Sequence, residues 1–199
     1  MKTGRTCENG ENVMKSLIAA AALLVVPATA ATAQTTPAPA PAPAADPVAK
    51  IYDKALGAGW QNWSWATTEL SADIGSPRMP IMVEAKGYQA LYLHHEPFSA
   101  APYRGISMLI QVVGGNAEVR IMAFAKGQPI PDGTKVGADG KPEAKAKVVK
   151  LAPGGWTKIV IPFGDLGITK STMIDGFCVQ NGSGEAAPHF YVADVMLNS

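Results

Sequence analysis

Hydrophobic and polar positions alternate in short runs along most of the chain from residue 50 to residue 197. The runs are rich in β-branched and aromatic residues, and Gly, Pro, Asn and Ser separate them. This pattern is typical of successive β-strands joined by turns, and no long stretch has the period of a helix. The pattern therefore predicts an all-β fold. Three runs organise its last third, at residues 156–163, 174–180 and 189–197, and the apolar closing run is expected to lie inside a sheet.

Two further strand pairs are predicted in the middle of the chain. The runs at residues 106–113 and 117–125 flank a Gly-Gly-Asn tripeptide and predict a hairpin. The runs at residues 81–86 and 89–94 predict a second pair around Gly87. Successive side chains of a strand point to opposite faces, so parity separates core positions from outward positions. A single bulge would reverse that assignment.

The outward positions of these runs carry polar and aromatic side chains. Leu91 is expected to face the core, which leaves Tyr92 and His94 together on the outer face. By the same parity, Gln111 and Arg120 point outward from the central strands. An outer face with such residues is a candidate binding surface.

The densest aromatic stretch is WQNWSWATTEL at residues 60–70. Trp63 and Trp65 share one face of this predicted strand, with Asn62 and Ser64 on the other. Two interpretations stay open. Trp is heavily buried on average, which favours packing in the core or at its rim. An aromatic face also stacks on the apolar C–H face of a sugar ring, which favours ligand binding.

Other residues whose side chains could bind a metal or a ligand, or act as a nucleophile, give weaker indications of function. His94 and His95 are neighbours on a strand and point in opposite directions, so they do not predict a transition-metal site. Arg104 lies in a predicted turn, where it is either a solvated charge or a fork-shaped donor to sugar hydroxyls or a carboxylate. Cys178 lies in an apolar run and is interpreted as a small buried residue rather than a nucleophile.

The first 47 residues differ in composition from the rest. Residues 14–33 combine Lys15, an apolar run and a small-residue cleavage site, and predict a secretory signal peptide too short for a membrane span. Residues 1–13 are interpreted as an extension upstream of the true start, the alternative being a long n-region. Residues 34–47 form a Pro/Ala-rich linker. One domain at residues 48–199 remains, expected to be periplasmic or extracellular.

The charge balance excludes one class of partner. The chain has a formal net charge of +1, which becomes about zero once residues 1–33 are removed. No concentrated basic run occurs, so a nucleic-acid partner is not expected. An uncharged ligand fits this composition better.

Catalytic motifs are not found in the sequence. It contains no nucleophile elbow, phosphate loop or zinc motif. Its acidic residues are scattered, whereas a glycosidase needs two carboxylates held across a sugar. The chain is therefore expected not to be an enzyme. The minority alternative is a small polysaccharide lyase or hydrolase, in which Tyr92, His94 and Arg104 would be suitable residue types.

Several segments, taken in order, resemble galactose-binding-like β-sandwich domains. They are IYDKALGAGWQNWSWA, ALYLHH, a Trp-led strand ending in IPF, then DLGI, IDGFCVQN and HFYVADVML. The resemblance covers roughly residues 50–197. Such domains are common as carbohydrate-binding modules, alone or attached to glycoside hydrolases. The resemblance implies a two-sheet jelly-roll sandwich, an architecture that lectin domains share.

The resemblance also implies where a ligand would bind. In such modules the concave outer face of the central strands is a common ligand site. The side chains that fold and parity together place on one groove there are Tyr92, His94, Gln111, Arg120 and Gln180.

A structural calcium ion is a further implication of the resemblance. Such modules often hold Ca²⁺ between their first and last strands, through acidic and backbone oxygens. Asp53 and Asp194 are the candidate ligands here. The last strand of these modules often reads FYVDDV. Ala193 replaces its first Asp and removes one oxygen ligand.

These observations lead to a functional expectation with a rival. The leading expectation is an exported, non-catalytic protein that binds a polysaccharide or a cell-envelope glycan. The rival is a structural or adhesion module that binds a protein partner at the envelope. A groove with convergent polar groups favours the first, and a flat apolar patch favours the second.

Overall fold

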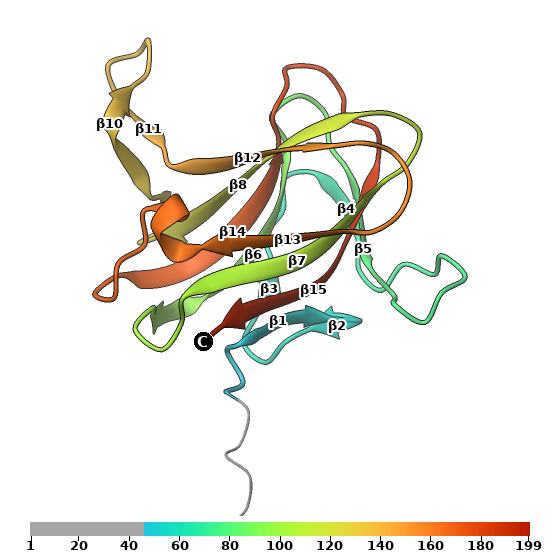
Figure 1. Ribbon diagram of the computed structural model, residues 1–199, viewed down its shortest axis with the longest axis horizontal. Helices are drawn as coiled ribbons and strands as arrows, with labels where there is room; N and C mark the ends of the chain where they lie inside the picture. The colour runs from blue at the N-terminus through green and yellow to red at the C-terminus, as the bar shows by residue number, and fades with distance from the viewer. Residues whose placement is uncertain (1–45) are drawn as a thin grey trace, which may run out of the picture. The chain divides into compact units, whose positions relative to one another are not determined.

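The computed structural model describes residues 46–199. The predicted extension and signal peptide, and all but the last two residues of the linker, lie outside the described residues. The described part is an all-β sandwich of two antiparallel sheets, as Figure 1 shows. The predicted fold class, a two-sheet jelly-roll sandwich, is confirmed.

The strands of the seven-stranded sheet are β1 (Lys50–Asp53), β2 (Ala55–Leu56), β4 (Thr67–Glu69), β5 (Ile81–Glu84), β7 (Gly105–Val112), β13 (Thr157–Pro162) and β15 (Phe190–Asn198). Those of the six-stranded sheet are β3 (Gln61–Asn62), β6 (Ala90–Ser99), β8 (Ala117–Ala125), β9 (Gln128–Pro129), β12 (Ala146–Leu151) and β14 (Met173–Asn181). A separate pair is formed by β10 (Pro131–Val136) and β11 (Pro142–Ala144), and the 3-10 helix η1 covers Phe163–Leu166.

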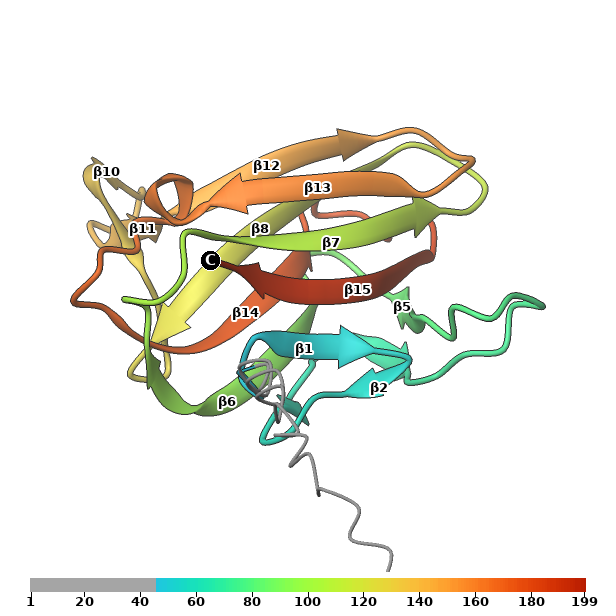
Figure 2. The ribbon, with the colours of Figure 1, turned by 60° about the horizontal axis from the view of Figure 1, so that its bottom comes forward.

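Strands distant in sequence are neighbours in both sheets. The seven-stranded sheet has the order β13-β7-β15-β1-β2, with β5 pairing to β15 and β4 to β5. The six-stranded sheet has the order β12-β8-β14-β6-β3, with β9 beside β8. In Figure 2, β7, β15 and β1 lie one below the other, and β8 and β14 cross behind them. The last strand is therefore central, as its apolar sequence predicts.

The main core lies between the two sheets. Ile106 and Ile110 of β7 and Val119 and Ile121 of β8 are fully buried there. Each such side chain contributes about 1.5–3 kcal/mol through burial. The parity predicted for these strands is confirmed, because their inward positions are those that the alternation selects.

The pairing predicted for the same strands is wrong. β7 pairs with β13 and β15, whereas β8 pairs with β12 and β14. The Gly-Gly-Asn segment therefore carries the chain from one sheet to the other and closes no hairpin. The pair predicted around Gly87 fails for the same reason, because β5 and β6 belong to different sheets. Both segments have turn residues, and turn residues alone do not specify which strands pair with each other.

A bulge interrupts the last strand. The register of β15 against β7 shifts between Ala193 and Met196, and Asp194 has a positive φ of 50°. Phe190 and Val192 face the core before the bulge, and Val195 and Leu197 are buried after it. The extra residue changes the parity of the strand, as bulges do.

Candidate functional site

The outer face of the six-stranded sheet carries a second apolar cluster. Its members are Ala90, Tyr92, Met122, Phe124 and Cys178, which are all buried. They come from β6, β8 and β14, at positions whose parity is opposite to that of the main core. A sheet face that points to solvent is normally polar. This cluster must therefore be covered by other parts of the chain.

Residues 63–66 provide part of the cover. They run alongside β6, where the Trp63 N–H donates to the Tyr92 carbonyl at 2.9 Å and the Trp65 N–H to the Ala90 carbonyl at 3.2 Å. Both indoles flank the Tyr92 ring, with centroid separations of 6.5 Å and 6.3 Å. Trp63 and Trp65 nevertheless remain 55% and 44% exposed. They are neither fully packed nor fully exposed, so the packing interpretation holds in part and the ligand-binding interpretation stays a prediction.

The register of the strands places side chains in rows across this outer face. One row joins Arg120 of β8, Gln180 of β14 and Ala90 of β6, and ends at Trp65. The next row joins Met122, Cys178 and Tyr92, and ends at Trp63. The first row is polar and the second is apolar, so hydrogen-bonding groups lie beside an apolar strip.

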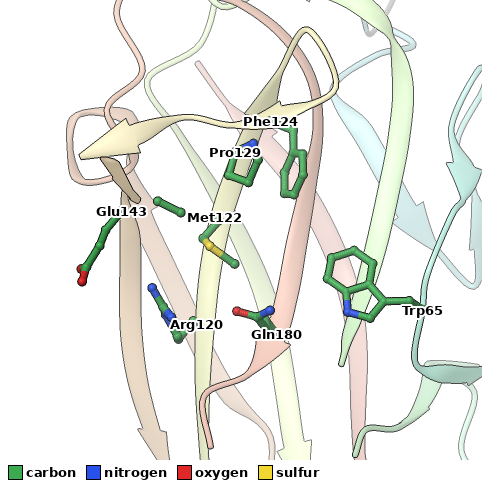
Figure 3. A pocket seen from close by; sticks show the side chains of 8 residues that line it. Trp65, Arg120, Met122, Phe124, Pro129, Glu143 and Gln180 are labelled. Carbon is green, nitrogen blue, oxygen red and sulfur yellow. The ribbon is translucent and has the colours of Figure 1, made fainter. Parts of the chain in front are cut away.

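A groove of about 340 Å³ opens over these rows. Its floor is made by Arg120, Met122 and Phe124 of β8 and by Gln180 of β14. Trp65 forms one wall and Glu143 lies on the opposite side, as Figure 3 shows, and Pro129 and Ala144 also line the groove. The volume lies within the usual range for small-ligand sites, about 300–1,000 Å³. An exposed indole facing a guanidinium and an amide can bind a ligand that has an apolar face and several hydroxyl groups.

The polar groups of the groove are held to different degrees. Within residues 46–199, neither Arg120 nor Glu143 is part of an ion pair. The Gln180 amide and the Trp65 indole are held, because each donates to the Tyr88 carbonyl, at 2.9 Å and 3.1 Å. One cation and one carboxylate line the groove, so its charge is balanced and suits a neutral ligand better than a charged one.

Tyr92 and His94 point outward, as predicted, but they lie beneath other side chains. Tyr92 is 7% exposed, and its ring packs on Phe124 at a centroid distance of 4.5 Å. His94 is half-buried and stacks on Trp63 at 3.6 Å. Neither residue lines the groove. Tyr92 packs beside both indoles and His94 stacks on Trp63 alone, and the expectation that Tyr92 is exposed is wrong.

Two of the predicted ligand-binding residues lie outside the groove. Gln111 belongs to β7 in the seven-stranded sheet, and its side-chain amide donates to the Gly154 carbonyl at 2.7 Å. Arg104 is exposed between β6 and β7, where its backbone bonds to Asn198 and Phe163. The prediction that Gln111 converges with Arg120 is wrong. The alternation along a strand predicts on which face of a sheet a side chain lies, but it does not predict which sheet the strand joins.

The charge state of the buried cluster is set by burial. Burial raises the pKa of the Tyr92 phenol, and the nearby Asp175 carboxylate adds to the effect. Burial also raises the pKa of the Cys178 thiol to about 12, so the thiol is protonated at neutral pH. Cys178 is 1% exposed and free, which confirms its interpretation as a small buried residue.

Asp175 occupies a bulge of β14. The register against β6 shifts between Ile174 and Gly176, and Asp175 is 3% exposed. One carboxylate oxygen accepts the Gly127 N–H at 2.6 Å. The other, Oδ1, has no hydrogen-bond partner among the described residues.

The residues named for calcium do not fit that ion. Asp194 is paired with Arg78, and Asp53 accepts from Lys50 at 3.1 Å. The described part of the chain contains no group of three or more His, Cys, Asp and Glu side chains that could hold a metal. Calcium needs several oxygen ligands together. Calcium binding stays a prediction.

Several residues that line the groove are not among the ligand-binding residues predicted from the sequence. Phe124 has the same parity as Arg120 and Met122, so extending the alternation by two residues would have found it. Pro129, Glu143 and Ala144 reach the groove because the chain folds back over β8 through β9 and β11. No signal in the sequence indicates that return.

Comparison with known proteins identifies the class of fold. No protein-family model and no curated protein matches the chain in sequence. A similar solved structure is the family 11 carbohydrate-binding module from Clostridium thermocellum in complex with a β-1,3-1,4-mixed-linked tetrasaccharide. It is 18% identical, with a TM-score of 0.50 over 71% of this chain and 89% of that chain.

Other matches are variants of a family 29 carbohydrate-binding module. One is 14% identical, with a TM-score of 0.47 over 74% of this chain and 82% of that chain. Another, in complex with mannohexaose, is 13% identical, with a TM-score of 0.47 over 75% and 89%. The family 11 likeness shows the fold: this chain is a carbohydrate-binding-module-like β-sandwich. The predicted resemblance is confirmed at that level.

Proposed function

We propose that the protein is an exported, non-catalytic carbohydrate-binding protein that takes a neutral polysaccharide or cell-envelope glycan in the groove over β8 and β14. The observation that carries the proposal is the position of Trp65. Its indole is held by a hydrogen bond, is 44% exposed, and faces Arg120 and Gln180 across the groove.

This arrangement matches the two chemical faces of a sugar. The C–H face of a pyranose is apolar and stacks on an indole, whose face is electron-rich. The ring hydroxyls lie at the edge of the sugar and reach the guanidinium and amide, which offer donors and an acceptor. Met122 and Phe124 complete the apolar floor.

The proposed absence of catalysis rests on the composition of the groove. Glu143 is the one carboxylate among the described residues that line it. Hydrolysis of a glycosidic bond normally uses two carboxylates on either side of the sugar. The proposed export rests on the signal-peptide pattern of residues 14–33. Within residues 46–199, no helix combines the length and apolarity that a membrane crossing requires.

A glycan array tests this function. The purified protein is screened beside an Arg120→Ala, Gln180→Ala double variant, on a panel that includes the mixed-linked tetrasaccharide and neutral and uronic polysaccharides. We expect selective retention of a neutral glycan by the protein and its loss in the variant, with unchanged thermal unfolding. Release of reducing or unsaturated ends would contradict the non-catalytic assignment. Retention of no glycan would contradict the function and lead to a search for an envelope protein partner.

A further inference from the structure

Tyr88 adopts a backbone conformation that its side chain disfavours. Its φ is 59°, in the left-handed region that glycine occupies without penalty. Its side chain is 58% exposed, so it adds little to either apolar cluster. Strained backbone conformations of this kind persist where the surrounding structure holds them in place, and they concentrate at functional sites.

The backbone of Tyr88 is tied to the groove. Its carbonyl accepts both the Trp65 indole N–H and the Gln180 amide N–H. Trp65 forms the aromatic wall and Gln180 lies in the floor, so Tyr88 stands at the edge where these two meet. Its conformation fixes the orientation of both.

The loop that carries Tyr88 is held in place by the loop after β14. The Tyr88 N–H donates to the Ser183 carbonyl at 3.0 Å. The Asn181 amide donates to the carbonyls of Lys86 and Glu185, at 3.1 Å and 2.6 Å. A Cβ on Gly87 would lie 2.1 Å from the Gly184 carbonyl oxygen, so the two loops are in close contact. The position of Tyr88 is therefore set before any ligand arrives.

The Tyr88 ring lies against this second loop. A Cβ added to Gly184 would be 3.6 Å from the ring, which leaves the ring supported on one side and exposed elsewhere. A supported, exposed aromatic ring on the residue whose carbonyl holds Trp65 has the properties of a stacking surface, since little side-chain freedom is lost on binding.

We infer that the ring of Tyr88 is a further stacking position at the rim of the groove, and that the site therefore binds an oligosaccharide chain extending past Trp65. This inference rests on the proposed function. It adds a specificity for chain length, because Tyr88 is not among the residues that line the groove, and a ligand confined to the groove does not contact its ring.

Tyr88→Gly is the direct test. Glycine adopts the same φ without strain and keeps the carbonyl, so Trp65 and Gln180 retain their partner and the protein is expected to be as stable as before or more so. Affinities are measured by calorimetry for the disaccharide, tetrasaccharide and hexasaccharide of the cello- and manno-series and for the mixed-linked tetrasaccharide. Tyr88→Asn, which also tolerates this φ, is the second ring-deletion variant, and Tyr88→Phe keeps the ring.

We expect both ring deletions to weaken binding of the hexasaccharide by roughly 3- to 10-fold, with unchanged affinity for the disaccharide and full retention in Tyr88→Phe. Equal affinities at every length would overturn the inference. Equal losses at every length would also overturn it, because they would place the role of Tyr88 in holding Trp65 and Gln180. Binding of no saccharide by the unmodified protein would instead refute the proposed function itself.

Discussion

The outer faces of the two sheets both carry apolar side chains, but these are exposed on one sheet and buried on the other. On the seven-stranded sheet, Val160 is 58% exposed and Met196 is 39% exposed, and they lie on that surface without a second cluster beneath them. On the six-stranded sheet, Tyr92 and Phe124 are buried although their parity points them away from the core. The difference lies in what covers each face.

The cover comes from segments outside the regular strands. Residues 63–66 lie beside β6, and β9 and β11 bring Pro129 and Glu143 over the other side. These segments bury the apolar side chains at the centre and leave a groove between them. The comparison indicates that the groove results from an incomplete second layer over one sheet.

Gly176→Ala is expected to have the largest effect. A Cβ there would lie 2.5 Å from the Tyr92 ring and 2.7 Å from the Leu93 carbonyl oxygen, and that carbonyl cannot move freely. We expect the free energy of unfolding to fall by about 1–3 kcal/mol, measured by urea denaturation.

Gly155→Ala is the matched control from the loop before β13. A Cβ at Gly155 meets no atom within 4 Å, so we expect a change within about 0.5 kcal/mol. Equal changes in the two variants would show that the covered face is no more tightly packed than the loops of the other sheet.

Trp65→Ala tests the binding wall. Removing an exposed aromatic anchor from a groove is expected to weaken glycan affinity by roughly 10-fold, measured by calorimetry with the glycan that the array selects. Trp156, which lies beside β13 with Arg78 at 5.2 Å from its ring centroid, is the matched residue next to the other sheet. Trp156→Ala is expected to leave affinity unchanged. A loss in Trp156→Ala as large as that in Trp65→Ala would move the site to the other face.

The smallest effect is expected from the ionisation of the covered cluster. Burial raises the pKa of Tyr92 above its value in the unfolded chain, which is about 10. The unfolded state therefore releases the proton first, so the contribution of Tyr92 to stability is constant below about pH 10 and falls as the pH rises further. Tyr92→Phe removes this titration and is expected to make the alkaline fall in melting temperature shallower. Tyr191→Phe, from the other sheet, is the control. An equally steep fall in Tyr92→Phe would contradict the contribution of the buried phenol.

The groove could be predicted in part. Parity correctly placed Arg120 and Gln180 on an outer face, and aromatic density pointed to Trp65. Parity failed for Gln111, because alternation along a strand says nothing about the neighbouring strands. It also failed for the exposure of Tyr92, because the cover over this residue comes from Trp63 and Trp65, which meet it only in the folded chain.

The sequence by itself determined the all-β class, the inward and outward positions of most strands, and the central place of the last strand. These follow from local alternation and from the apolar character of each run, which are properties of a few adjacent residues. The tertiary structure alone decided which sheet each strand joins, where the bulges at Asp175 and Asp194 fall, and which outer face is covered. Those outcomes depend on contacts between segments that are distant in sequence. The pattern of a single run carries no information about such contacts.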